Sequence, residues 1–305
     1  MGRYHAAIIS GLAWVLGASA SAQVSGTVET YYQSDRLSHG FSNVLSWVEL
    51  NARLNSNLKG TFSITDLRFK RVLDEFNVQY ETGGNMIRAG RMRISFGFSN
   101  WSELFYTGYN HTPIVRSANL VDKTRLNRDD AGIEITTGGP NLQIQAAVVD
   151  SRPSDFQVAP KRIRYGSVRV QSSFGPVIAA IDALPSLDGN GSIYGLDLRW
   201  TSPHIVAKAE YMKGVGDGPT AQGYYGDVAY RLPGLPRTQL VSRTEWLDRS
   251  NGGEFRLHTF GAKQIVTQNL TVNVNYGWGT GKAPAFVENS PSLGWSLRAL
   301  FQVHF

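Results

Sequence analysis

The chain has 305 residues, of which 42% are hydrophobic and 32 are glycine, and it contains no cysteine. The lack of cysteine excludes a disulfide framework, a thiolate metal site and a cysteine nucleophile. A formal net charge of +6 is enough to bias a pore toward anions, but it is far below the dense basic surface of a nucleic-acid-binding protein, so we expect no nucleic-acid partner.

Residues 1–22 have the pattern of a secretory signal peptide. Arg3 supplies the positive charge, residues 6–17 form an apolar core, and residues 20–22 form a small-x-small cleavage site. The apolar core is too short to cross a bilayer, which takes about 20 residues. We therefore expect an exported protein whose mature chain, 23–305, forms a single domain.

Beyond the leader, apolar and polar residues alternate in many short segments. In 270–278, for example, Leu, Val, Val, Tyr and Trp alternate with Thr, Asn, Asn and Gly. A period of two predicts a β-strand with one dry face and one wet face. The sixteen segments with this pattern lie near 25–34, 44–55, 57–66, 74–82, 85–95, 131–138, 141–150, 163–173, 175–183, 192–201, 203–213, 221–231, 237–248, 255–266, 269–280 and 292–305.

The connections between the predicted strands alternate in length. Turns such as 83–84 and 138–140 are short and rich in glycine, whereas connections such as 35–43 and 151–162 are longer. An even number of strands with short turns at one end and long loops at the other is typical of a transmembrane antiparallel β-barrel. The alternative, a soluble β-sandwich, would not need one short end in every hairpin. The sequence therefore predicts an all-β barrel of about 16 strands.

The longest connection, 96–130, follows the fifth predicted strand. Long loops in compact folds are usually functional, and a barrel of sixteen strands leaves an aqueous channel that such a loop can enter. Its charged residues have both signs, and they would create a transverse field if they faced each other across a constriction. A solvated loop surface is the alternative. The candidates are Glu103, Arg116, Asp122, Lys123, Arg125 and Arg128.

The last predicted strand, 292–305, ends the chain on an aromatic residue. Leu293, Trp295 and Leu297 begin an apolar series that alternates with mostly polar residues and finishes at Phe305. This segment resembles the closing strand of bacterial outer-membrane barrels, whose assembly signal is an alternating aromatic strand ending in Phe.

A second resemblance lies at the start of the long connection. Residues 90–97, Gly-Arg-Met-Arg-Ile-Ser-Phe-Gly, resemble a Gly-Arg-aromatic-basic…Phe-Gly segment of the phosphate-selective-porin-like (O/P type) proteins. With the barrel plan, the chain resembles the bacterial outer-membrane porins, whose third external loop leaves after the same number of strands. The resemblance implies that 96–130 folds inward to narrow a pore and that the protein is a homotrimer.

Three arginines near this point, Arg88, Arg91 and Arg93, are predicted to face the lumen. This requires the alternation to slip by one residue at Gly90, and a β-bulge there would explain the slip. The alternative is that arginines at the rim contact lipopolysaccharide. Further inward charges are expected on the wall, where bases slightly outnumber acids. They include Glu134, Arg169, Lys208, Arg243 and Arg298.

Catalytic and metal-binding patterns are weak in this sequence. No two mature histidines have metal-ligand spacing, and His111 with Ser102 or Ser117 is the one candidate for hydrolysis, so we expect neither an enzyme nor a cofactor. We predict a porin in the bacterial outer membrane, surrounded by lipid and lipopolysaccharide, that carries small hydrophilic solutes passively with a mild preference for anions. A barrel that acts as a scaffold or adhesin is the alternative.

Overall fold

The computed structural model describes residues 21–35, 39–67, 70–93, 95–97, 108–109, 111–121, 129–150, 165–187, 189, 191–282 and 294–305. Within this part of the chain there are sixteen strands and one short helix, and each predicted segment coincides with one strand. The elements are β1 (Ser21–Asp35), β2 (His39–Arg53), β3 (Leu58–Leu67), β4 (Lys70–Thr82), β5 (Asn85–Arg93), α3 (Ile114–Ser117), β6 (Asp129–Gly138), β7 (Leu142–Asp150), β8 (Tyr165–Phe174), β9 (Val177–Leu184), β10 (Ser192–Thr201), β11 (Ile205–Val215), β12 (Ala221–Arg231), β13 (Thr238–Arg249), β14 (Gly253–Ile265), β15 (Leu270–Gly281) and β16 (Gly294–His304).

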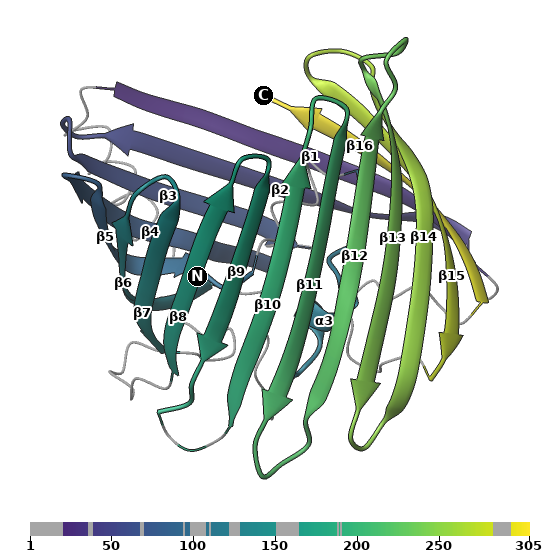
Figure 1. The fold of residues 1–305 in the computed structure, drawn as a ribbon. Helices are drawn as coiled ribbons and strands as arrows, with labels where there is room; N and C mark the ends of the chain where they lie inside the picture. Colours follow the sequence, from purple (N-terminus) through teal and green to yellow (C-terminus); the bar gives the residue numbers. More distant parts are fainter. Residues whose placement is uncertain are drawn as a thin grey trace.

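The strands form one closed antiparallel barrel (Figure 1). Each strand pairs with its neighbours in sequence, and β1 pairs with β16 in a register that runs from Thr27 opposite His304 to Asp35 opposite Ser296. The predicted fold class is confirmed. The predicted signal peptide lies outside the described residues except for its last two, which begin β1.

The distribution of polarity in this barrel is the reverse of that in a soluble protein, with apolar side chains outside and polar side chains inside. On β9 and β10, Ile181 and Leu196 are 60% and 56% exposed, whereas Asp182 and Asp197 on the other face are 5% and 2% exposed. A soluble sandwich buries its apolar faces, so the sandwich alternative is wrong. An apolar outer surface around a polar interior is the arrangement that a barrel surrounded by lipid requires.

Tight turns close one end of the hairpins. Between β4 and β5, Gly83 and Gly84 have φ values of 56° and 82°, which are the positive values that a two-residue hairpin turn of type I′ requires at both positions. Among the described residues, no helix is long and apolar enough to cross a membrane.

The pairing around Gly90 corrects one expectation. Gly90 has a φ of 127°, but β5 stays in regular register with both β4 and β6 through this residue, so the predicted β-bulge is absent. Met92 is fully buried and does not face lipid, which removes the reason for a slip. The register instead places Arg91 directly opposite Phe76, which is 43% exposed on the outer surface. The expected inward position of Arg91 is therefore not supported.

Candidate pore constriction

The connection between β5 and β6 enters the barrel where the structure describes it. Residues 108–109 and 111–121, here called the inner segment, include α3, which packs against β12 and β13 (Figure 1). Their apolar side chains are buried with Phe96 against the inner wall. The cluster contains Phe96, Ile114, Val115, Ala118, Leu120 and Val121 from the connection, and Ala147, Val149, Tyr165, Leu184, Ile193, Met212, Ala221, Tyr225, Leu247, Phe255 and Leu257 from the wall.

Glycines in the wall make room for this contact. A Cβ atom on Gly195 would lie 2.9 Å from the ring of Phe96, and one on Gly214 would lie 1.8 Å from the carbonyl oxygen of Leu120. The Ala221 amide of β12 donates to that same carbonyl at 2.9 Å. The inner segment therefore contacts the backbone of the wall strands as well as their side chains, and these contacts fix its distance from the wall.

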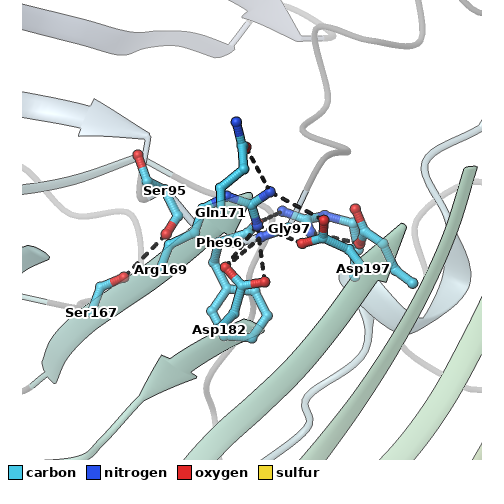
Figure 2. Close-up of polar contacts among 10 residues, drawn as sticks. Ser95, Phe96, Gly97, Ser167, Arg169, Gln171, Asp182 and Asp197 are labelled. Carbon is cyan, nitrogen blue, oxygen red and sulfur yellow. Dashed lines mark hydrogen bonds and ion pairs between the residues drawn. The ribbon is translucent and has the colours of Figure 1, made fainter. Parts of the chain in front are cut away.

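The root of the connection, residues 95–97, is held by a buried ionic cluster (Figure 2). Arg169 of β8 donates through Nη1 to both carboxylate oxygens of Asp182 at 2.9 Å and through Nη2 to Oδ1 of Asp197 at 3.1 Å. Asp182 Oδ1 also accepts the Gly97 amide at 3.1 Å, and Ser167 Oγ donates to the Ser95 carbonyl at 3.2 Å. One arginine thus orders the two carboxylates, and one of these holds the backbone of the root.

Arg116 of α3 joins the inner segment to the root. Its Nη1 donates to Glu210 Oε2 of β11 at 3.0 Å, and its Nη2 donates to the Phe96 carbonyl at 2.8 Å. Gly97 has a φ of 68°, and a Cβ there would lie 2.4 Å from Arg116 Nη1. Only glycine combines this conformation with the space that the guanidinium occupies.

Two inward residues of β13 hold the other end of the inner segment. Glu245 accepts the ring Nε2–H of His111 and the amide of Ile114, both at 2.7 Å. Arg243 donates to both carboxylate oxygens of Asp227, at 2.6 and 2.9 Å, and to the His111 carbonyl at 2.8 Å. These contacts leave His111 only 7% exposed, which does not favour its role as the base of a hydrolase.

The predicted pore-lining residues fall into three groups. Arg169 and Arg243 of the wall and Arg116 of the connection are 1–3% exposed, so they are buried between the connection and the wall. Arg88 donates to Glu134 at 3.0 Å, and Arg93, Lys208 and Arg298 also lie on the wall, whereas Arg91 is opposite the exposed Phe76. Arg93 Nε is 4.0 Å from Glu75, Lys208 is opposite Asp227, and Arg298 is 4% exposed. Glu103, Asp122, Lys123, Arg125 and Arg128 lie outside the described residues.

Sequence reasoning missed two parts of this site. It gave no role to Asp182 or Tyr109, whose hydroxyl donates to the Ser242 carbonyl at 2.7 Å. It also did not foresee apolar residues on the inner wall. A signal for Asp182 was present, because it is the one charged residue in the otherwise apolar strand β9.

Several solved structures have a fold similar to that of this chain. OmpF of Salmonella typhi, in complex with daunomycin, matches with a TM-score of 0.73 at 9% identity, covering 93% of this chain and 97% of that chain. An anion-selective porin from Comamonas acidovorans matches with a TM-score of 0.66 at 12% identity, covering 93% and 99%. The outer membrane channel DcaP of Acinetobacter baumannii matches at 0.63 and 11%, covering 94% and 98%. The fold is that of the bacterial outer-membrane porins.

The porin fold is recognised from structure rather than from sequence. No family model matches the sequence, and no curated protein matches it either. At 9–12% identity, what these structures share with the chain is the barrel.

Proposed function

We propose that this protein is an outer-membrane porin, a water-filled channel through which small hydrophilic solutes diffuse passively. The observation that carries the proposal is the inverted polarity of a closed sixteen-stranded barrel, with exposed apolar residues outside and charged residues inside. A barrel of this size leaves an aqueous channel, and the connection that enters it narrows the bore.

Aromatic residues on the outer surface support a position in the membrane. Trp295 and Phe305, near the two ends of β16, are separated by ten residues and face outward with Leu297. At ~3.3 Å per residue and a strand tilt of ~40°, they lie about 25 Å apart along the membrane normal. That distance equals the height of the apolar band of outer-membrane barrels, which aromatic residues border on both sides. We place the protein in the bacterial outer membrane, in contact with lipid and lipopolysaccharide.

The proposed selectivity is a mild preference for anions. It is supported by the positive net charge: with the predicted signal peptide and its Arg3 removed, 29 Lys and Arg remain against 24 Asp and Glu, a net charge of about +5. The similar fold of the Comamonas acidovorans porin, which is anion-selective, agrees with this direction. The narrower resemblance of residues 90–97 to phosphate-selective-porin-like proteins stays a prediction, as does the homotrimer; one solved structure of similar fold, OmpT of Vibrio cholerae, is a trimer form.

Electrical recording in planar lipid bilayers tests the proposal. The refolded protein should give stable open conductance, and a salt gradient should give a reversal potential of the sign expected for excess anion flux. A scaffold or adhesin, the alternative function, would show no stable conductance. A reversal potential of the opposite sign would overturn the anion preference and leave the channel intact.

A further inference from the structure

The two ends of the barrel differ in charge. At the end closed by the tight turns, here called the tight-turn mouth, the four terminal residues of the strands include seven bases and one acid. The bases are Arg53, Lys59, Arg88, Arg199, Lys208, Arg231 and Lys263, and the acid is Glu81. At the opposite end, the four terminal residues of the strands include seven bases and eight acids. Those bases are Lys70, Arg71, Arg91, Arg93, Lys213, Arg249 and Arg256, and the acids are Asp35, Asp66, Asp129, Asp130, Asp150, Asp182, Asp248 and Glu254. Among the described strands, the excess of bases is therefore concentrated at the tight-turn mouth.

The arginines that end strands at the tight-turn mouth lie on the inner face of the barrel. Leu198 is 48% exposed on the outer face of β10, so the next residue, Arg199, lies on the inner face. Val48 is 41% exposed on the outer face of β2, and Arg53, an odd number of residues further along, lies on the inner face. The same alternation places Arg231 of β12 inside. Their charges are therefore directed toward the bore.

Two pairs of bases are directly opposite each other on neighbouring strands. Arg53 of β2 is opposite Lys59 of β3, and Arg199 of β10 is opposite Lys208 of β11. In the closed ring of sixteen strands, β10 is as far from β2 as any strand can be, so the two pairs lie on opposite sides of the bore. Like charges directly opposite each other destabilise a sheet. An arrangement that costs stability and surrounds the bore is explained if its charge acts on the solutes that pass.

Much of this charge is not neutralised by the protein. Arg53, Arg199 and Arg231 make no salt bridge with any residue that the structure describes, and Arg199 donates through Nε to a neutral group, Thr201 Oγ1, at 3.3 Å. Arg53 and Arg231 are exposed, and Arg199 is partly exposed. By contrast, each of the three buried arginines between the connection and the wall binds a carboxylate. The arginines of the mouth are therefore available to ions, whereas those beneath the connection are not.

We propose that the tight-turn mouth sets the anion preference of this channel, and that its charge makes the current depend on the direction of ion flow. The inference rests on the proposed porin function. A positive potential of about 1 kT enriches anions about threefold at an entrance and depletes cations by the same factor. Current should be larger at the voltage sign that drives anions in through the tight-turn mouth, because they then enter from the enriched side. In outer-membrane barrels the short turns face the periplasm, so the basic mouth is the periplasmic one.

Salt should weaken this effect, because the mouth arginines are in contact with water. The Debye length is about 10 Å at ~0.1 M ionic strength and about 3 Å at ~1 M, and buried charges are screened much less than exposed ones. An anion preference set by the mouth should therefore be clear at low salt and nearly absent at high salt. A preference set by charges buried in the constriction should persist at both.

Reversal potentials in planar bilayers, measured in KCl gradients centred near ~0.1 M and near ~1 M, test the proposal. The triple variant Arg53→Gln, Arg199→Gln, Arg231→Gln should lower the anion-to-cation permeability ratio about threefold at the lower salt and change it little at the higher. It should also conduct nearly equally at both voltage signs. Arg199→Gln alone should give a smaller shift of the same sign. Its matched control is Arg256→Gln, which removes one charge from an outward side chain, 62% exposed, at the opposite end.

Chemical restoration of the charge separates an electrostatic role from a structural one. The chain contains no cysteine, so Arg199→Cys introduces a single thiol at the mouth. Modification with a cationic methanethiosulfonate should restore the anion preference, and modification with an anionic one should lower it further. Heat-modified gel mobility confirms that each variant has formed a barrel.

The outcomes separate this inference from the channel itself. Absence of conductance in the unsubstituted protein would refute the porin function. A conducting channel whose selectivity responds neither to the triple substitution nor to the sign of the group attached at position 199 would overturn the role of the mouth and leave the channel standing. A loss of preference as large at ~1 M as at ~0.1 M salt would also overturn it, because exposed charges are screened at the higher concentration.

Discussion

The buried arginine beneath the root of the connection makes a sharp prediction about stability. Arg169→Met removes the partner of Asp182 and Asp197, and all three side chains are only 1–4% exposed. Breaking a buried ion pair by removing one partner costs about 3–5 kcal/mol, because the remaining charge is left without compensation. We expect Arg169→Met to lower the free energy of unfolding by that amount.

Urea unfolding of the refolded barrel in lipid vesicles, followed by tryptophan fluorescence, measures this free energy. The matched control is Arg256→Met, because Arg256 pairs with Glu254 but the two side chains are 62% and 45% exposed. An exposed pair contributes about 0–1 kcal/mol, so this variant should be nearly as stable as the original. Adding Asp182→Asn and Asp197→Asn to Arg169→Met should restore part of the loss. Equal effects of the two arginine substitutions would refute the reasoning.

Four further variants, three substitutions and one deletion, test other parts of the structure. Gly195→Val should displace the Phe96 ring, which lies 2.9 Å from the site of its Cβ, and should change single-channel conductance. Ile181→Lys, at a position 60% exposed on the outer face of β9, should cost about 2–4 kcal/mol in urea unfolding. Leu235→Lys, equally exposed at 58% but in a turn, should cost almost nothing in the same assay. Deletion of Phe305, which pairs with β1 through two backbone hydrogen bonds, should reduce the fraction of closed barrels seen as heat-modifiable bands on gels.

The strands were predictable because each strand of this barrel has two faces in two different media. In β15, Val274, Tyr276 and Trp278 are 42–43% exposed, while Asn273 and Asn275 on the other face are 0–3% exposed. Alternation of this kind can be recognised in the sequence alone, before the fold is known. The strand order followed as well, since every connection joins neighbouring strands.

The contacts of the inner segment were only partly predictable, because a strand face that packs against protein is as apolar as a strand face that contacts lipid. Leu247, Phe255 and Leu257 are fully buried on the inner surface, and from sequence alone they are indistinguishable from lipid-facing residues. Met92 misled the reading of β5 for the same reason, since it is apolar, inward and buried. The length of the connection indicated a functional loop, but its contacts depend on strands far away in sequence.

Ion selectivity was the hardest property to predict, because a pattern of inward charges does not show whether the charged groups contact water or each other. The wall strands β9–β13 carry the inward acids Asp182, Asp197, Glu210, Asp227 and Glu245. Arg169 and Arg243 of the wall bind three of them, with Arg169 shared between Asp182 and Asp197, and the connection brings Arg116 to Glu210 and His111 to Glu245. Docking of the connection therefore uses charges that would otherwise act on a passing ion. The selectivity of such a pore depends on the charges that remain after docking, so counting inward residues overstates it.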